Sequence, residues 1–212
     1  MTVSETLEKQ TTEVPEEIHP DIVEAETVEY LTGFDAAFLP IPVPGAAEFE
    51  VVEFYAGGTS AFHIWTPEER ALIRGRVTLP IWVPTPQLDN PSQVAQGVAH
   101  TLRALGIPSG AKPYRAVMWD METSENAEWL TAACNRLASL GYDSYVYGSA
   151  SSVFKLPQRS GYIVADPTGE VHLYDHEGVV GTQYAFDVQT LGGAVDADVY
   201  LESIRSHLSV LA

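Results

Sequence analysis

The sequence predicts an α/β protein: an irregular (β/α)8 barrel of the TIM type with an extended acidic arm in front of it. From Leu31 onward, short apolar runs alternate with segments of helical periodicity, which is typical of strand and helix units around a parallel sheet. An open doubly wound sheet fits the same pattern, but close to eight candidate strands favour a closed barrel. Residues 31–212 are short for eight full units, so some helices must be reduced or missing.

The expected strands are short runs rich in β-branched and aromatic residues, and each ends near a turn-forming residue. In chain order they are Leu31–Phe38, Phe49–Tyr55, Thr78–Pro84, Ala116–Glu122, Ser144–Gly148, Tyr162–Ala165, Val179–Tyr184 and Val195–Val199.

Three expected helices each stop at a glycine, which readily adopts the left-handed conformation of a helix C-terminus. The first begins with Thr66-Pro67-Glu68-Glu69, which combines a capping hydroxyl, a proline at the first helical position and a glutamate for a capping box. These three helices are expected at Thr66–Gly75, Pro91–Gly106 and Ser124–Gly141, and a last helix at about Val199–Leu211.

The charge of the chain is strongly negative and unevenly distributed. With 11 Lys+Arg against 29 Asp+Glu the net charge is −18, which disfavours nucleic acid as a partner because phosphate would be repelled. Residues 1–30 carry nine acidic residues and only Lys9 as a base. This arm is expected to be either a solvated tail or a segment that becomes ordered on a protein partner.

The sequence contains no recognisable targeting signal and only one cysteine. The opening MTVSETLEKQ has neither the basic start nor the apolar core of a signal peptide, and no run of about 18 apolar residues occurs. The protein is therefore expected to be cytoplasmic at synthesis and not to insert into a membrane. Cys134 lies in an apolar helical pattern and is expected to be a small buried side chain.

The segment Arg115–Thr123 contains the most informative pair of acids. Because side chains alternate along a strand, Met118, Asp120 and Glu122 are expected on one face. Two carboxylates so close resist double ionisation, so one is expected to have a raised pKa, as a general acid requires, while the other stays ionised. Alternatively, one of them caps the following helix or pairs with Arg115.

Other strand ends carry further polar and aromatic residues that point to a sugar site. Asp35 lies toward the end of the first expected strand and Asp196 belongs to the last, so a barrel would bring both to the rim with Asp120 and Glu122. Aromatic rings for stacking on sugars, or else for core packing, and one amide are expected there too: Tyr55, Trp82, Trp119, Tyr147, Gln183 and Tyr184.

No metal or cofactor is expected. His172 and His176 are flanked by turn-forming residues, so helical alignment of the two imidazoles as metal ligands is not predicted. The pair Gly57-Gly58 lacks the spacing of a phosphate-binding loop.

Six short motifs together resemble a known family. They are Gly33-Phe34-Asp35, Tyr55-Ala56-Gly57-Gly58, Trp119-Asp120-Met121-Glu122, Tyr147-Gly148-Ser149, Gly181-Thr182-Gln183-Tyr184 and Val195-Asp196. In this order they resemble the glycoside-hydrolase-like domain of actinobacteria and their phages, which is similar to family 25 lysozymes. The resemblance covers roughly residues 31–212.

The resemblance implies an irregular β/α barrel that hydrolyses β-1,4 bonds of an amino-sugar polymer such as peptidoglycan. Glu122 matches the proton donor, Asp120 the assisting acid, and Asp35 and Asp196 two further rim acids. Tyr147 and Gln183 match sugar-contacting positions.

Two departures from related patterns accompany this resemblance. Met118 stands where chitinase-like barrels have the first Asp of D-x-D-x-E, and Thr182 stands where an aromatic residue often precedes the Gln-Tyr pair. The alternative function is a non-catalytic structural or glycan-binding component of a phage particle or another large assembly, tethered by the acidic arm.

Overall fold

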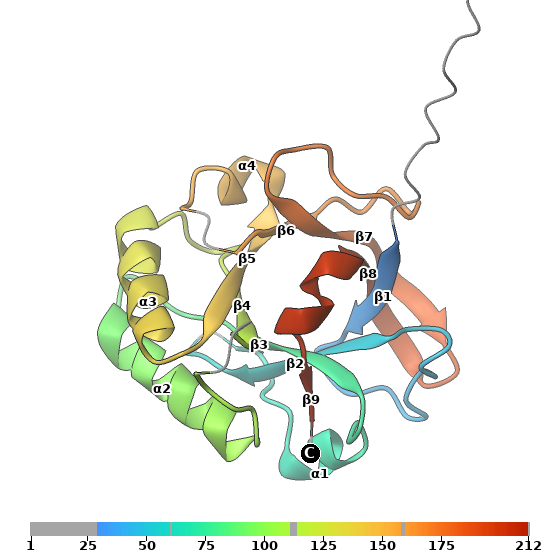
Figure 1. The fold of residues 1–212 in the computed structure, drawn as a ribbon. Coiled ribbons are helices and arrows are strands. Elements are labelled where there is room, and N and C mark those ends of the chain that lie inside the picture. The colour runs from blue at the N-terminus through green and yellow to red at the C-terminus, as the bar shows by residue number, and fades with distance from the viewer. Residues whose placement is uncertain (1–28, 60, 111–113, 158–159, 212) are drawn as a thin grey trace, which may run out of the picture.

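A closed barrel of eight strands forms the body of the protein (Figure 1). The computed structural model describes residues 29–59, 61–110, 114–157 and 160–211. The strands are β1 (Tyr30–Asp35), β2 (Val51–Gly57), β3 (Val77–Trp82), β4 (Ala116–Asp120), β5 (Asp143–Ser149), β6 (Tyr162–Ala165), β7 (Val179–Thr190) and β8 (Gly193–Leu201).

Hydrogen-bonded pairing runs round the whole ring. Neighbours from β1 to β7 are parallel, whereas β8 is antiparallel to both β7 and β1 and closes the barrel between them. The barrel predicted from the strand count is therefore confirmed, and the open sheet is excluded. The mixed pairing makes it irregular.

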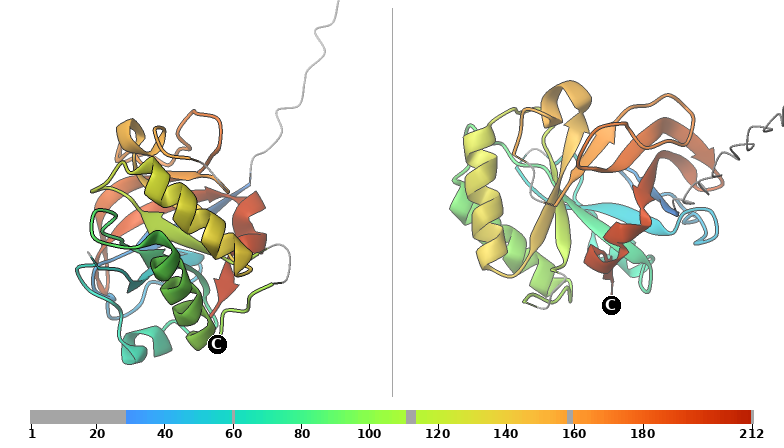
Figure 2. Two further views of the ribbon diagram at one scale, coloured as in Figure 1. Left: turned by 90° about the vertical axis from the view of Figure 1, so that its left-hand side faces the viewer. Right: turned by 45° about the horizontal axis from the view of Figure 1, so that its top comes forward.

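Helices cover the barrel unevenly. They are α1 (Pro67–Ala71), α2 (Pro91–Ala104), α3 (Ala127–Ser139) and the short α4 (Ala150–Val153), which follow β2, β3, β4 and β5. The two long helices, α2 and α3, lie side by side against one side of the sheet (Figure 2). Within the described residues, β6 and β7 lead onward through a loop and a hairpin without a helix, which explains how so short a chain closes a barrel.

The predicted helix ends have the expected chemistry. At α1 the Thr66 hydroxyl accepts a hydrogen bond from the Glu69 amide at 3.2 Å, and the Glu69 carboxylate accepts one from the Thr66 amide at 2.7 Å. These reciprocal bonds form the predicted capping box. Gly106 and Gly141, which follow α2 and α3, have positive φ angles of 77° and 84°.

The end of the chain differs from the prediction. The expected helix at Val199–Leu211 is wrong, because β8 continues to Leu201 and is followed by the 3₁₀ helix η1 (Glu202–His207) and the short strand β9 (Ser209–Val210), antiparallel to β3. Ile204 and Leu208 pack into the barrel interior, whereas Leu211 packs in a cluster outside it. The apolar residues that suggested a helix therefore lie on two different surfaces, one inside the barrel and one outside it.

Two packed layers hold the barrel together. Inside, apolar side chains from several strands meet, and η1 lies across the barrel's end nearest the viewer in Figure 1. Outside, α2 and α3 cover Trp119, which lies edge-on to Trp129 with ring centroids 5.8 Å apart. Cys134 on α3 is buried in this outer layer, as expected.

The structure describes almost none of the predicted acidic arm. Of residues 1–30, only Glu29 and Tyr30 are described, and Tyr30 begins β1; the rest of the expected arm lies outside the described residues. Within the described ranges, no helix has both the length and the apolar character needed to cross a membrane.

Candidate active site

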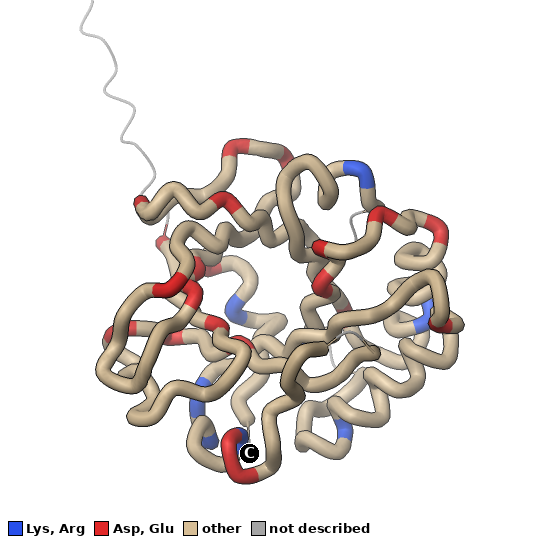
Figure 3. Tube along the Cα trace, turned by 180° about the vertical axis from the view of Figure 1, so that it is seen from behind, with Lys and Arg blue, Asp and Glu red and all other residues tan. Residues whose placement is uncertain are grey.

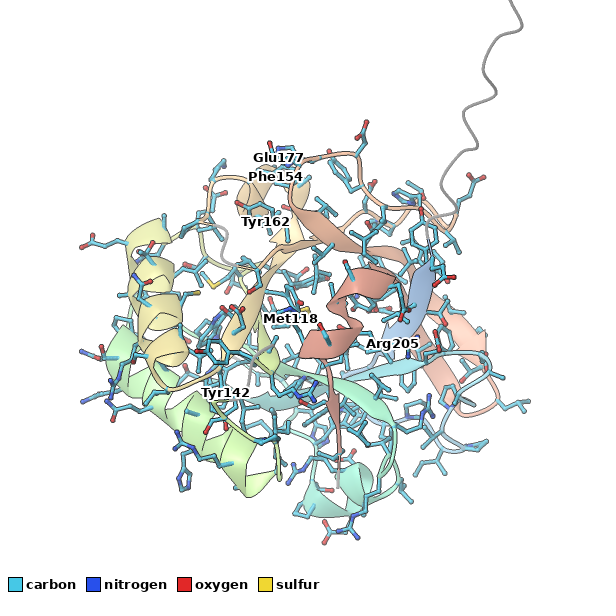
Figure 4. All side chains as sticks on the ribbon, viewed as in Figure 1. Met118, Tyr142, Phe154, Tyr162, Glu177 and Arg205 are labelled. Atoms are coloured by element: carbon cyan, nitrogen blue, oxygen red, sulfur yellow. The ribbon has the colours of Figure 1, made fainter. Side chains whose placement is uncertain are left out.

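A cavity of about 320 Å³ opens at the ends of the parallel strands, and its walls are rich in carboxylates. The four predicted acids Asp35, Asp120, Glu122 and Asp196 all line it. So do Tyr55, Tyr147 and Gln183 of the predicted sugar-contacting residues, together with Ile81, Met118, Phe186 and Asp187. Seen from behind, acidic positions surround the centre of the trace (Figure 3). In Figure 4, Met118 is labelled near the middle of the barrel.

Strand register explains why these residues meet. Asp35 on β1 lies directly opposite Asp196 on β8, and Asp120 on β4 lies beside Tyr147 on β5. Residues paired in this way have side chains on the same face of the sheet. The barrel therefore brings together acids that are far apart in the sequence.

Asp120 and Glu122 occupy different depths of the cavity. Asp120 is 8 % exposed, and its Oδ1 accepts a hydrogen bond from the Glu122 amide at 3.1 Å. Burial raises the pKa of Asp120 to about 6, with a further rise from the charge of Glu122 and a partial offset from the amide. Glu122 is exposed at the mouth. Partial desolvation raises its pKa, and a hydrogen bond from Tyr147 partly counters the rise.

The structural alternatives for this pair do not apply. The N-cap of α3 is Asn126, whose side-chain oxygen accepts a hydrogen bond from the Trp129 amide at 3.0 Å. The Arg115 guanidinium donates instead to the backbone carbonyls of Ser206 and Leu208. Neither a helix cap nor an ion pair with Arg115 therefore accounts for the two carboxylates.

A hydrogen-bonded chain connects the rim to the barrel interior. The Tyr147 hydroxyl lies 2.6 Å from Oε1 of Gln183 and 3.4 Å from Oε1 of Glu122. The Gln183 amide in turn donates to Oδ2 of Asp35 at 2.7 Å. Because the hydroxyl has one proton and the shorter contact is to Gln183, Glu122 receives only a weak bond. This weak donation is consistent with the net upward shift of its pKa.

The other two rim acids also have raised pKa values. Asp35 is 6 % exposed, and burial together with the charge of Glu53 raises its pKa well above the usual range. Burial likewise raises the pKa of Asp196, although the Asp187 amide donates to its Oδ1 at 2.9 Å. The cavity therefore favours protonated carboxyl groups or a positively charged ligand.

Three of the predicted sugar contacts lie elsewhere. Trp82 and Trp119 pack in the outer layer, and Tyr184 packs against the cluster outside β1 and β2. Each follows or precedes a cavity-lining residue on its strand, so alternation directs its ring to the opposite face.

Some lining residues were not predicted. Phe186 and Asp187 reach the cavity because the pairing of β7 with β8 is irregular between Ala185 and Val188, and Asp187 has a φ of 53°. Such a bulge redirects side chains and has no clear signal in the sequence. Glu53 and Asp198 are buried, and each has a side-chain oxygen within 4.8 Å of one on the cavity-lining Asp35. The sequence did contain a signal for Asp198, because it lies two residues after Asp196 on the same strand, and residues two apart on a strand share a face.

The two histidines considered as metal ligands have other neighbours. In the connection between β6 and β7, Nε2 of His172 lies 3.0 Å from the Asp166 carboxylate. The ring of His176 stacks on Phe154, which is labelled in Figure 4, with the ring centroids 3.7 Å apart.

Comparison with known proteins gives matches only at the level of structure. No family model and no curated protein matches the sequence. An uncharacterized B. stearothermophilus protein aligns with a TM-score of 0.62 and 17 % identity, over 84 % of this chain and 100 % of that one. The Clostridium perfringens spore cortex lytic enzyme SleM aligns with a TM-score of 0.61 and 14 % identity, over 84 % of this chain and 69 % of that one.

A muramidase from Acremonium alcalophilum aligns with a TM-score of 0.58 and 13 % identity, over 84 % of this chain and 99 % of that one. The chain has a lysozyme-like fold. At these identities the likeness concerns the fold, which agrees with the resemblance to family 25 lysozymes. It assigns no role to any side chain.

Proposed function

We propose that this lysozyme-like barrel hydrolyses β-1,4 bonds in a peptidoglycan-type amino-sugar polymer, with Glu122 as the general acid and Asp120 assisting. The observation that carries the proposal is the meeting of Asp35, Asp120, Glu122 and Asp196 in one cavity. Glycosidases generally use a pair of carboxyl groups, and the surroundings of the pair shift the pKa of one of them.

The positions of the two central acids suit different roles. Glu122, at the mouth, donates its proton to the glycosidic oxygen as the bond from that oxygen to the anomeric carbon breaks. The departing sugar thus leaves as a neutral alcohol, and positive charge develops on the remaining ring. Asp120, held below by the Glu122 amide, stabilises that charge or orients the substrate's N-acetyl group. Water then adds to the anomeric carbon and returns a proton to the site.

The remaining cavity walls favour a carbohydrate over an anionic ligand. Tyr55 and Phe186 supply ring surface, and the Tyr147 and Gln183 side chains supply hydrogen-bonding groups. Among the described residues that line the cavity, none is a lysine or an arginine. A phosphate or sulfate would therefore find carboxylates in place of counter-charges.

The direct test is release of reducing ends from purified peptidoglycan by the full chain and by Glu122→Gln. The substitution keeps the shape of the side chain and removes the ionisable proton, so we expect the activity to be lost. The matched control is Glu125→Gln, since Glu125 is exposed, pairs with Lys155 and lies outside the cavity lining. Full activity of Glu122→Gln, or no hydrolysis by the folded wild-type protein, would overturn the proposal.

A further inference from the structure

Three carboxylates gather beneath the rim at the junction where the barrel closes. Asp35 on β1, Glu53 on β2 and Asp198 on β8 each offer a side-chain oxygen within 4.8 Å of the other two. Their exposed fractions are 6 %, 0 % and 1 %. Glu53 and Asp198 do not line the cavity, so they are additional to the acids of the proposed reaction. We call Asp35, Glu53 and Asp198 the inner carboxylate cluster.

Several oxygens of the inner carboxylate cluster have no donor. Asp35 accepts from Gln183, and Oε1 of Glu53 accepts from the Tyr200 hydroxyl. In the described chain, however, no group donates a hydrogen bond to Oε2 of Glu53 or to either oxygen of Asp198. The ion pairs of the described residues do not include these three acids.

Such an arrangement has to be neutralised, either by protons on the carboxyl groups or by a positive charge from outside the chain. An isolated buried carboxylate is strongly unfavourable, and three within a few ångströms also repel one another. Asp198 is the clearest case, because it is fully desolvated, its only hydrogen-bonding neighbour is another acid of the cluster, Glu53, and no other described group donates to its oxygens.

We propose that the inner carboxylate cluster binds one hard divalent cation, of the Ca²⁺, Mg²⁺ or Mn²⁺ class. Carboxylate oxygens are the ligands that such ions prefer, and the spacing of the three acids allows them to share one ion. The surroundings fix the ligands: Tyr200 holds Glu53, and a Cβ at position 33 would come within 2.7 Å of the Tyr200 ring and 3.3 Å of Glu53 Oε1. Gly33 thus leaves the room that this arrangement requires.

A bound cation would stabilise the fold as well as neutralise the local charge. Its three ligands come from β2, β1 and β8, which are adjacent in the sheet, and β8 is the antiparallel strand that completes the ring. A bound ion therefore links strands at the closure of the barrel, and binding stabilises the folded state. This inference does not depend on glycoside hydrolysis.

The test is cation binding by the full chain after treatment with a chelator and its removal. Calorimetric titration with CaCl₂, MgCl₂ and MnCl₂ in turn is expected to show one site for at least one of them, and the same salt is expected to raise the midpoint of thermal unfolding. Asp198→Asn keeps the side-chain shape but removes a ligand charge, so we expect at least about a tenfold weaker affinity. Glu53→Gln is a second variant with the same expectation.

Variants at the rim separate this site from the proposed active site. Glu122→Gln and Asp120→Asn alter acids outside the inner carboxylate cluster and are expected to bind the cation as the wild type does, whether or not they hydrolyse a glycan. Two results would overturn the inference: no effect of any of the three salts on wild-type stability, or equal binding by Asp198→Asn. Either result would mean that protons neutralise the three acids.

Discussion

Asp120 provides a quantitative test of the electrostatics of the site. Its substitution by asparagine preserves the shape of the side chain and an oxygen at the position that accepts the Glu122 amide at 3.1 Å. What it removes is a negative charge on a side chain that is only 8 % exposed. The free energy of unfolding of Asp120→Asn should therefore differ from that of the wild type in a manner that depends on pH.

The expected size follows from the pKa. Burial, with a contribution from Glu122, raises the pKa of Asp120 from 3.8 to about 6. A displacement of this size corresponds to about 3 kcal/mol, since each pKa unit is worth about 1.4 kcal/mol. The folded state holds the proton more tightly than the unfolded chain does, so stability falls as the pH rises between these two values.

At pH 4 the unfolded chain is already mostly ionised at this position, so between pH 4 and pH 7 the wild type should lose about 2 kcal/mol more than Asp120→Asn. Urea unfolding of both proteins at the two pH values measures this directly. Asp175→Asn is the matched control, because Asp175 is exposed and its carboxylate remains hydrated. A stability difference between wild type and Asp120→Asn that is the same at both pH values, or that changes in the opposite direction, would refute the reasoning.

Two further predictions concern packing and hydrogen bonding around the site. Tyr147→Phe removes the donor 2.6 Å from the buried Gln183 oxygen, so urea unfolding should show a loss of about 1–3 kcal/mol; unchanged stability would contradict the hydrogen-bonded chain. Gly181→Ala would place a methyl group 2.4 Å from the Tyr200 ring, and a loss of about 1–3 kcal/mol is expected in the same assay. Its control is Gly97→Ala on α2, where nothing lies within 4 Å and a gain of about 0.5–1 kcal/mol is expected; a stable Gly181→Ala would disprove the tight interior packing.

The sequence allowed the barrel to be predicted because its strands and helix ends have strong local signals. The strand Tyr162–Ala165 has the predicted bounds, and the capping box at Thr66 forms as expected. Asp35 and Asp196 could be placed at one rim because a closed sheet brings the ends of distant strands together. Neither inference required knowledge of side-chain packing.

Other features depended on contacts that the sequence does not specify. The last expected helix was wrong because Tyr200, in its first turn, belongs instead to β8 and fills space left by Gly33 and Gly181. The alternation of side chains along a strand places the consecutive residues Trp119 and Asp120 on opposite faces of the sheet, and on this ground Trp119 could have been left out of the predicted site. The bulge at Asp187 and the approach of Glu53 to Asp198 arise only when β7, β8 and the neighbouring strands are paired.

The most direct measurement of the central claim is a crystal structure of Glu122→Gln with a β-1,4-linked oligosaccharide of N-acetylglucosamine and N-acetylmuramic acid. The substitution leaves the cavity in place while preventing proton donation, so an intact substrate should be captured. We predict a glycosidic oxygen within hydrogen-bonding distance of the side chain at position 122 and a ring beside Asp120. An oligosaccharide bound away from these two positions, or no binding by the folded protein, would contradict the account.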